Sequence, residues 1–445
     1  MGALADCRPR LLVLAYYFPP ANKIGGIRAL NMSKALAQRG WDVTVVSLAV
    51  SRWRKVERED EVAQELEIAG IRCIRTGHNW RNLSPSDLTC RDGRVAWIWG
   101  GICRRTARLL GVEYQIGWLN PAARACAALK REDVDLILAT GPPFLSFRLA
   151  AQIAMRLNRP YVLDYRDLWT DNPFARRLAR PSAMSEERLL IAGAAAVTVV
   201  SNRVADSLQE NYSVGDKVCV VTNGYDPEDL SGVQPRSFGH FAIVYTGQFY
   251  PPKHVIDPLL AALVRLKTMP SVKRDWKFHY FGPHGALVRE AIENKDLASD
   301  VVVHGNVPRR DALAALAGAD LSIVITSVRE SGSFADLGVV TGKVFEAIGL
   351  KKPVLAIAPR GSDLEKILTT SGLGQRFSGA EVELMARFIA DLVNGRRVVP
   401  REPENYSWTE IGDNVDAVLR GIVAARPAFR AKTRLPSAEG LPRVY

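Results

Sequence analysis

Two ionisable side chains three positions apart, Lys343 and Glu346, are the residues of this sequence best placed to bind a phosphorylated ligand. They lie in residues 341–357, a segment whose pattern predicts a turn, a short helix and a buried strand. The spacing puts both side chains on one helical face near the N-terminal end, where unpaired N–H groups carry a partial positive charge. A phosphate could bind there with Lys343, and Glu346 could accept hydrogen bonds from ribose hydroxyls. An ordinary surface Lys–Glu pair is the simpler alternative.

Two further segments follow predicted strands and suit the same chemistry. Gly25 and Gly26 come between the first strand and its helix, where glycine lets the backbone approach a phosphate or a sugar closely. Gly247 and Gln248 open a loop that ends in Lys253, which could neutralise a diphosphate leaving group. The alternatives are a plain Gly-Gly turn and a solvent-exposed loop lysine.

Asp164, Arg166 and Asp167 come at the carboxyl end of a strand predicted over 161–164. Two carboxylates and an arginine are costly at such a position unless they are paired or used in a reaction. An ion pair between Arg166 and an aspartate that shapes the loop is therefore the alternative to a functional role.

Several other enzyme classes lack their motifs here. Asp133 and Asp135 match the D-x-D of metal-dependent transferases but precede an apolar strand, so we expect only a turn that leads into that strand. The dinucleotide-binding, P-loop, esterase and zinc-protease motifs are absent. The six cysteines and six histidines are scattered, which indicates reduced thiols and no metal site.

The elements that must position these residues are strands alternating with helices, which predicts an α/β protein with parallel, doubly wound sheets. A helix with Ala29, Met32 and Leu36 on one face follows the first strand. The predicted strands of a first sheet are 11–15, 43–48, 71–75, 136–140, 161–164, 196–200 and 218–222. Those of a second sheet are 241–246, 277–281, 301–304, 321–325, 354–357 and 375–377.

At 445 residues the chain is too long for one core. We expect an N-terminal Rossmann-like domain over 1–230 and a C-terminal one over 231–404, facing a central cleft. Residues 227–239, rich in Asp, Pro, Gly and Ser, are the predicted linker. The Pro- and Arg-rich tail, 426–445, should be poorly ordered.

A net charge of +12 calls for an anionic partner: a nucleoside diphosphate, an anionic membrane or nucleic acid. Nucleic acid is disfavoured because no binding motif accompanies the charge. No apolar run is long enough to span a bilayer and no secretory signal precedes the first strand, so we expect a cytoplasmic protein. Residues 80–119 are rich in Trp and Arg, and a helix over 95–110 could lie on an anionic membrane or pack on the first sheet.

Together these segments resemble the GT-B glycosyltransferases, family 4 in particular, over roughly residues 11–423. The resemblance depends on the order and spacing of motifs in both halves of the chain. In the first half they are YFPP (17–20), GG (25–26), TGPP (140–143) and DYRDLWT (164–170). Further on they are NGYD (223–226), YTG (245–247), HGNV (304–307) and GKVFE (342–346).

The resemblance implies roles for individual residues. Lys253 matches the phosphate-binding lysine, and Glu346 matches the last glutamate of the E-x7-E signature, which holds the donor ribose. Val307 is similar to the position whose backbone contacts the base, and Gly25 and Gly26 would lie near the donor diphosphate or the acceptor. A final helix at about 405–425 resembles the one that packs back on the first domain in this fold.

The sequence also departs from the family. The residue eight before Glu346 is Gly338, so the first glutamate of E-x7-E is not in register. Either Glu330 replaces it, or Lys343 takes part of its role.

Two more departures concern the charged groups of the site. Gln248 stands where an arginine often accompanies the phosphate lysine, so neutralisation would depend on Lys253 and Lys343. Many members have a histidine where this chain has Gly-Pro-Pro after Thr140, which leaves Asp167 as our candidate catalytic group in the first domain.

The mechanism implied is transfer of a sugar from a nucleoside diphosphate sugar to a hydroxyl, with retention at the anomeric carbon and neither metal nor cofactor. A glycan or lipid-linked acceptor in cell-surface polysaccharide or glycolipid assembly, reached from the inner face of the membrane, is the matching expectation. Two alternatives stay open: a GT-B protein that binds nucleotide or glycan without catalysis, and an enzyme of another chemistry on this fold, such as a nucleotide-sugar epimerase or a phosphorylase.

Overall fold

The computed structural model describes residues 8–21, 24–49, 59–78, 105, 113, 115–172, 181–293, 295–401 and 403–425. These residues form two compact units. The N-terminal unit holds the described residues up to Val200, Ser207–Val221, and those from Gly412 on. The C-terminal unit holds Ser201–Asp206 and Thr222–Ile411. The predicted membrane-facing helix at 95–110, apart from Arg105, and the tail at 426–445 lie outside the described residues.

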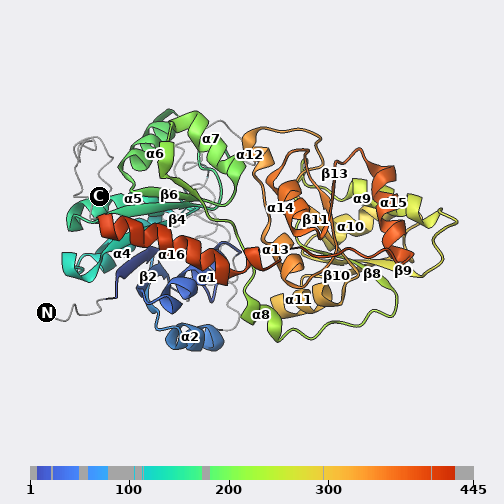
Figure 1. The fold of residues 1–445 in the computed structure, drawn as a ribbon, viewed down its shortest axis with the longest axis horizontal. Helices are drawn as coiled ribbons and strands as arrows, with labels where there is room; N and C mark the ends of the chain where they lie inside the picture. Colours follow the sequence, from blue (N-terminus) through green and yellow to red (C-terminus); the bar gives the residue numbers. More distant parts are fainter. Residues whose placement is uncertain are drawn as a thin grey trace. The chain divides into compact units, whose positions relative to one another are not determined.

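The described strands of the N-terminal unit form one parallel sheet in the order β3-β2-β1-β4-β5-β6-β7 (Figure 1). Its strands are β1 (Arg10–Leu14), β2 (Asp42–Leu48), β3 (Arg72–Thr76), β4 (Leu136–Gly141), β5 (Tyr161–Tyr165), β6 (Ala196–Val199) and β7 (Val218–Val220). Its helices are α1 (Ile24–Gln38), α2 (Glu59–Ile68), α4 (Leu119–Cys126), α5 (Leu145–Leu157), α6 (Pro181–Gly193) and α7 (Asn202–Tyr212). The first residues of α7, up to Asp206, belong to the C-terminal unit. Short 3-10 helices are η3 (Ile116–Trp118), η4 (Arg131–Asp133) and η5 (Gly215–Lys217).

The C-terminal unit has a second parallel sheet, in the order β10-β9-β8-β11-β12-β13 (Figure 1). Its strands are β8 (Phe241–Thr246), β9 (Trp276–Phe281), β10 (Val301–Gly305), β11 (Leu321–Ile325), β12 (Val354–Ile357) and β13 (Gly374–Phe377). Its helices are α8 (Pro227–Ser231), α9 (Asp257–Lys267), α10 (Gly285–Ile292), α11 (Arg309–Gly318), α12 (Phe334–Leu337), α13 (Gly342–Gly349), α14 (Asp363–Ser371) and α15 (Val382–Val393). The 3-10 helix η6 (Pro403–Tyr406) precedes α16 (Trp408–Ala425). The prediction of two doubly wound parallel sheets is confirmed.

Two connections differ from simple linkers. The segment predicted as a linker begins with α8, because the Asp226 side chain accepts a hydrogen bond from Glu228 N at 3.0 Å and Pro227 occupies the first helical turn. The final helix, α16, belongs to the N-terminal unit from Gly412 on, where Trp41 Nε1 donates to Asp416 Oδ1 at 2.6 Å.

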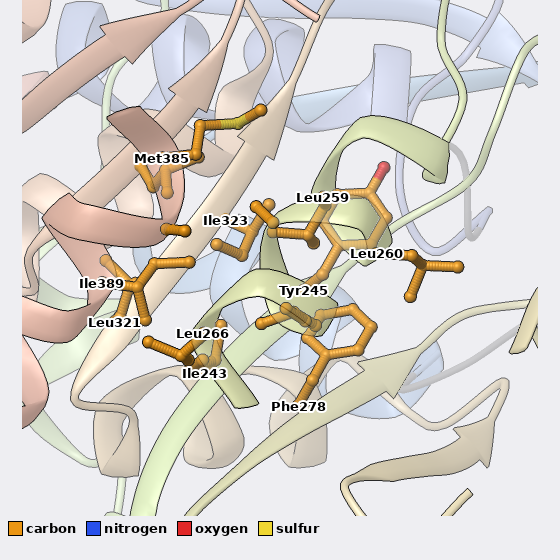
Figure 2. Packing of buried hydrophobic residues seen from close by; sticks show 14 of the residues in the cluster. Ile243, Tyr245, Leu259, Leu260, Leu266, Phe278, Leu321, Ile323, Met385 and Ile389 are labelled. Atoms are coloured by element: carbon orange, nitrogen blue, oxygen red, sulfur yellow. The ribbon is translucent and has the colours of Figure 1, made fainter. Parts of the chain in front are cut away.

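The core of the C-terminal unit explains why its strands read as continuous apolar runs. Ile243 and Tyr245 of β8 pack with α9 and α15 on one face of the sheet, as Figure 2 shows. Ala242 and Val244, the alternate residues, belong to a second buried cluster with Phe281. Both faces are therefore covered, so no polar alternation is needed.

Each sheet has one place where the strand order reverses: between β1 and β4 in the N-terminal unit, and between β8 and β11 in the C-terminal unit. In parallel sheets of this kind ligands bind outside the carboxyl ends of the strands at such a switch point. None of the helices in the described part of the chain is both long and apolar enough to cross a bilayer.

Candidate functional site

Lysines and carboxylates from three segments are brought together at the carboxyl ends of β8 and β11. Lys253 lies in the loop after β8, and Asp336 lies in α12, which follows β11. Lys343 and Glu346 lie in α13, between β11 and β12. The structure thus places Lys253, Lys343 and Glu346, three of the candidate residues from the sequence, at one edge of the second sheet.

Lys343 lies at the N-terminal end of α13, where the side chain of the N-cap residue Thr341 makes no capping hydrogen bond. Its side chain passes over Gly247: a Cβ at that glycine would lie 2.7 Å from Lys343 Cε and 3.3 Å from Nζ. Burial lowers the pKa of Lys343, with Glu346 raising it and Arg309 lowering it further. No carboxylate of the described residues lies within ion-pair distance of Lys343. A partly buried cation without a counter-ion at a helix N-terminus suits an anionic ligand.

Glu346 is engaged by an arginine that the sequence did not indicate. Arg309, the first residue of α11, hydrogen-bonds Glu346 Oε1 through Nη1 and contacts Asp229 Oδ2 at 3.3 Å through Nη2. Burial by itself would lower the pKa of Arg309, but the two carboxylates hold it above its ordinary value. Glu346 is 19% exposed, so this cluster is only partly screened by water.

Lys253 is also paired. Its Nζ hydrogen-bonds Asp336 Oδ1, and its backbone carbonyl accepts from Val328 N at 2.8 Å. The loops after β8 and β11 are thereby joined across the switch point. Asp336 was missed from the sequence; its signal was the Ser333-x-x-Asp336 capping box, which places a carboxylate at the start of a helix beside the site.

The remaining predicted donor-site residues of this unit have other neighbours. Gln248 is exposed, and its Oε1 accepts from the Tyr250 hydroxyl at 3.0 Å. Val307 packs, half-buried, against the Ala242 cluster. Glu330 is exposed, and no hydrogen bond or ion pair between the described residues joins its side chain to Lys253, Lys343 or Glu346. The structure therefore does not bring Glu330 into this cluster.

A partly buried histidine, His254, directly follows Lys253 in the loop after β8. His254 Nε2 is 2.9 Å from the Tyr245 hydroxyl, which also donates to the carbonyl of Gln248 at 2.8 Å. Burial, followed by the charges of Lys343 and His284, lowers the pKa of His254 to about 4. His254 is thus neutral at neutral pH and adds no charge to the site.

Three other histidines form a row across the sheet of the same unit. His240 and His279 approach through their Nε2 atoms at 2.8 Å, and His279 Nδ1 lies 3.0 Å from His304 Nε2. The His304 ring stacks on Phe281 with centroids 4.0 Å apart. Burial and the neighbouring positive groups lower the pKa of His279 to about 3. No group of three or more potential metal ligands occurs among the described residues.

In the N-terminal unit, Asp164 is a buried structural carboxylate. It bonds Arg28 Nη2 at 2.7 Å, Thr140 Oγ1 at 2.8 Å and Thr198 Oγ1 at 2.7 Å. Burial alone would raise the pKa of Asp164, but Arg28 and the two hydroxyls hold it below its ordinary value. Asp164 pairs with Arg28, which lies 136 positions away in the sequence, and not with Arg166. Burial holds the pKa of Arg166 below its ordinary value, although the charges of Asp167 and Asp164 both raise it.

Arg166 instead lies against Gly25, which together with Gly26 belongs to the first turn of α1 and not, as predicted, to the loop before that helix. Its guanidinium donates to the carbonyls of Gly141 and Pro142 and lies over the Tyr17 ring at 6.0 Å. A Cβ at Gly25 would fall 1.8 Å from Arg166 Nη1, so only glycine fits under this side chain. A Cβ at Gly26 would lie 3.2 Å from the Phe18 Cα. The two glycines therefore permit close packing at this switch point.

Asp167 and the D-x-D segment complete the predicted sites of this unit. Asp167 is exposed in the loop after β5. Asp135 accepts from Arg10 N at 2.9 Å immediately before β4, and Asp133 closes η4. The expectation of a turn leading into a strand is confirmed for Asp133 and Asp135.

Two parallel Rossmann-like sheets, each with charged or glycine-rich segments at its switch point, define a GT-B protein. Two family models match the chain: a glycosyl transferase 4-like domain over residues 25–224 and glycosyl transferases group 1 over residues 240–393. The chain belongs to the GT-B glycosyltransferases of the family 4 type, as the sequence motifs predicted. It is a glycosyltransferase enzyme. No curated protein sequence matches the chain.

Solved structures share this fold. Sucrose-phosphate synthase from Thermosynechococcus elongatus is 15% identical with a TM-score of 0.60, over 94% of this chain and 100% of that one. A glycosyltransferase from Rickettsia africae is 16% identical with a TM-score of 0.56, over 96% and 100%. Anabaena HepE, solved in complex with UDP and glucose, is 14% identical with a TM-score of 0.53, over 94% and 97%. At these identities the likeness shows the fold alone.

Proposed function

We propose that this glycosyltransferase takes its sugar from a nucleoside diphosphate sugar whose diphosphate binds at the carboxyl ends of β8 and β11. The observation that carries the proposal is Lys343: a partly buried lysine with no carboxylate partner, crossing Gly247 at the uncapped start of α13. A buried cation costs free energy unless a counter-ion accompanies it. A diphosphate supplies that counter-ion.

The same geometry supports a retaining, metal-independent transfer without a cofactor. Lys343 and Lys253 would stabilise the negative charge that develops on the departing diphosphate. A phosphate oxygen of the leaving group, on the face that it vacates, would accept the proton of the acceptor hydroxyl, so no strong general base is required. The new C–O bond then forms on the face from which the old one leaves, which retains the anomeric configuration.

Glu346 would hold the ribose. The hydrogen bond from Arg309 to Oε1 fixes the orientation of the Glu346 carboxylate, and its second oxygen, Oε2, would accept from a ribose hydroxyl. Val307, Gly247 and Gln248 would line the base and phosphate positions, and Gly25 and Gly26 would approach the donor or the acceptor. HepE was solved with UDP and UDP-glucose, which favours a uridine diphosphate sugar as the first donor to test.

The acceptor proposal is a glycan or lipid-linked glycan used in cell-surface polysaccharide or glycolipid assembly, with peripheral contact to an anionic membrane. The supporting feature is the carboxyl edge of the first sheet. There the partly exposed Tyr17 ring lies under the Arg166 guanidinium, and Trp169, also partly exposed, stacks on Phe144 with centroids 5.1 Å apart. Aromatic faces and a cation suit a sugar ring attached to a phosphate. Asp167, exposed in the same loop, is the proposed catalytic group of this unit.

A ribose-specific titration tests the donor proposal. UDP and 2′-deoxy-UDP are titrated by calorimetry into wild type and into Glu346→Gln, which keeps the shape of the side chain but removes its charge. We expect UDP to bind wild type more tightly than the deoxy form, and Glu346→Gln to remove most of that difference. Glu365→Gln is the matched control. Glu365, on α14, also pairs with an arginine, Arg376 of β13, at 3.2 Å. Equal binding of UDP and 2′-deoxy-UDP to wild type would contradict the assignment of Glu346.

Product analysis tests the reaction itself. Wild type is incubated with UDP-sugars, with and without glycan or lipid-linked acceptors, and the products are separated by chromatography. Transfer with retained anomeric configuration in the presence of a chelator supports the proposal. Interconversion of UDP-sugars without acceptor would support an epimerase, and tight binding without turnover would support a non-catalytic protein.

A further inference from the structure

We infer that Asp336 determines which phosphorylated ligands this site accepts, because its carboxylate occupies Lys253 when no ligand is bound. A ligand phosphate gains the full charge of Lys253 when it replaces this internal anion, because an Asp336 carboxylate that stays in place neutralises the lysine and repels the phosphate. The inference rests on the proposed function, since it assigns Lys253 to the diphosphate.

The contacts of Asp336 show a carboxylate shared between two partners. Its Oδ1 hydrogen-bonds Lys253 Nζ, and its Oδ2 lies 3.3 Å from both the backbone nitrogen and the hydroxyl of Ser333. The Ser333 hydroxyl in turn accepts from Asp336 N at 3.3 Å, which closes the first turn of α12. Asp336 can therefore release Lys253 and still keep hydrogen bonds to Ser333.

Burial makes this exchange matter energetically. The side chains of Lys253 and Asp336 are 17% and 12% exposed, so water screens their attraction much less than at the surface. A phosphate that takes Lys253 must break this pair and then remain near the displaced carboxylate, which repels it.

Lys343 gives the site two unequal cations. Lys343 has no carboxylate within ion-pair distance in the described structure, whereas Lys253 is already neutralised by Asp336. A ligand with one phosphoryl group can bind Lys343 and leave the Lys253–Asp336 pair intact. A ligand with two phosphoryl groups reaches Lys253 as well, where the Asp336 charge weakens its binding until Asp336 is displaced. Removing the Asp336 charge should therefore favour diphosphates selectively.

A calorimetric titration of Asp336→Asn measures this selectivity. The probes are UDP, GDP, ADP and CDP with their matching monophosphates, at low salt. The diphosphate that binds wild type best should bind Asp336→Asn about tenfold more tightly, about 1.4 kcal/mol. Its monophosphate should change less than about twofold.

Asp300→Asn is the matched control. Asp300 also pairs with a lysine, Lys267 at 3.0 Å, but it precedes β10 at the amino edge of the same sheet. We expect Asp300→Asn to leave the affinities for the diphosphate and the monophosphate unchanged. Asp336→Ser, a second variant that retains a polar group in the first turn of α12, should reproduce the gain of Asp336→Asn and replaces it if the latter does not fold.

The outcomes separate the inference from the proposed function. Unchanged or weaker diphosphate binding by the Asp336 variants overturns the inference, because Asp336 would then support Lys253 rather than compete for it. An equal gain for monophosphate and diphosphate also overturns it. If wild type binds none of the diphosphates, the proposed function itself fails.

Discussion

Replacing Lys343 by methionine should weaken ligand binding without lowering the stability of the unliganded protein. The lysine is partly buried, and burial lowers its pKa, so its charge is a cost to the empty fold. Methionine keeps the aliphatic length that crosses Gly247 and removes the charge. The unliganded variant should therefore be as stable as wild type or more stable.

The expected loss of affinity follows from the contact that is removed. A hydrogen bond to a charged phosphate contributes roughly 2 kcal/mol, which corresponds to about thirtyfold in the dissociation constant. UDP at about 100 times the wild-type dissociation constant should stabilise the C-terminal unit by about 2.7 kcal/mol, and the same concentration should stabilise the variant by about 0.9 kcal/mol. For a unit of this size the shift in melting temperature would fall from roughly 8 °C to roughly 3 °C.

Thermal unfolding with and without UDP measures both effects. Lys352→Met is the control, because Lys352 is a partly buried lysine whose pKa burial also lowers, yet it precedes β12 at the amino edge of the sheet. It should keep the full UDP shift. An equal UDP shift in Lys343→Met and wild type would refute the assignment of Lys343 to the diphosphate.

Three other changes test separate parts of the structure. Gly247→Ala places a Cβ 2.7 Å from Lys343 Cε, so it should weaken UDP binding about tenfold in calorimetry by displacing that side chain. Asp164→Asn leaves Arg28 buried without its counter-charge and should lower the free energy of unfolding by about 3–5 kcal/mol at pH 7 in urea denaturation. Because the folded-state pKa of Asp164 is depressed, the stability it contributes is present above its unfolded pKa. The penalty should therefore shrink as the pH falls and the wild-type carboxylate is protonated. The folded-state pKa of His254 is lowered to about 4, so stability present above the unfolded pKa of about 6.5 is lost as the pH falls toward 4. His254→Gln should remove this loss, about 3 kcal/mol, from the pH profile.

Controls for these changes come from the same chain. Gly232→Ala meets no atom within 4 Å and should leave UDP binding unchanged. Asp413→Asn removes a carboxylate that is 66% exposed and paired with Arg39, so it should destabilise the protein far less than Asp164→Asn does. A loss as large as that of Asp164→Asn would contradict the view that burial sets the penalty.

Much of the fold could be predicted because its signals are local. Strands such as β8 are covered on both faces, so their sequences are continuous apolar runs, and helices between them give the parallel order. One local prediction was wrong: α8 begins where we predicted a linker. Its signal was local too, because Asp226 followed by Pro227 marks a helix start.

The site was only half predictable for a physical reason. Lys253 follows β8, and Lys343 and Glu346 lie in α13, which follows β11. The topology of a parallel sheet brings the segments that follow its strands to the same edge. Their partners do not follow such a rule: Asp336 lies 83 positions from Lys253, and Arg309 lies 37 from Glu346. Nothing in a local pattern states which carboxylate meets which cation, so Asp336, Arg309 and Asp229 required the structure.

The row of His240, His279 and His304 has a consequence for proton positions. Each N···N contact needs one ring to donate and the other to accept, and a neutral imidazole has a single N–H. While the three rings are neutral, their tautomers must therefore be ordered in the same sense along the row. If one terminal ring changes tautomer, the middle ring and then the far ring must change as well. The tautomer of His240, beside the start of β8, therefore determines which nitrogen of His304, at the end of β10, carries the hydrogen.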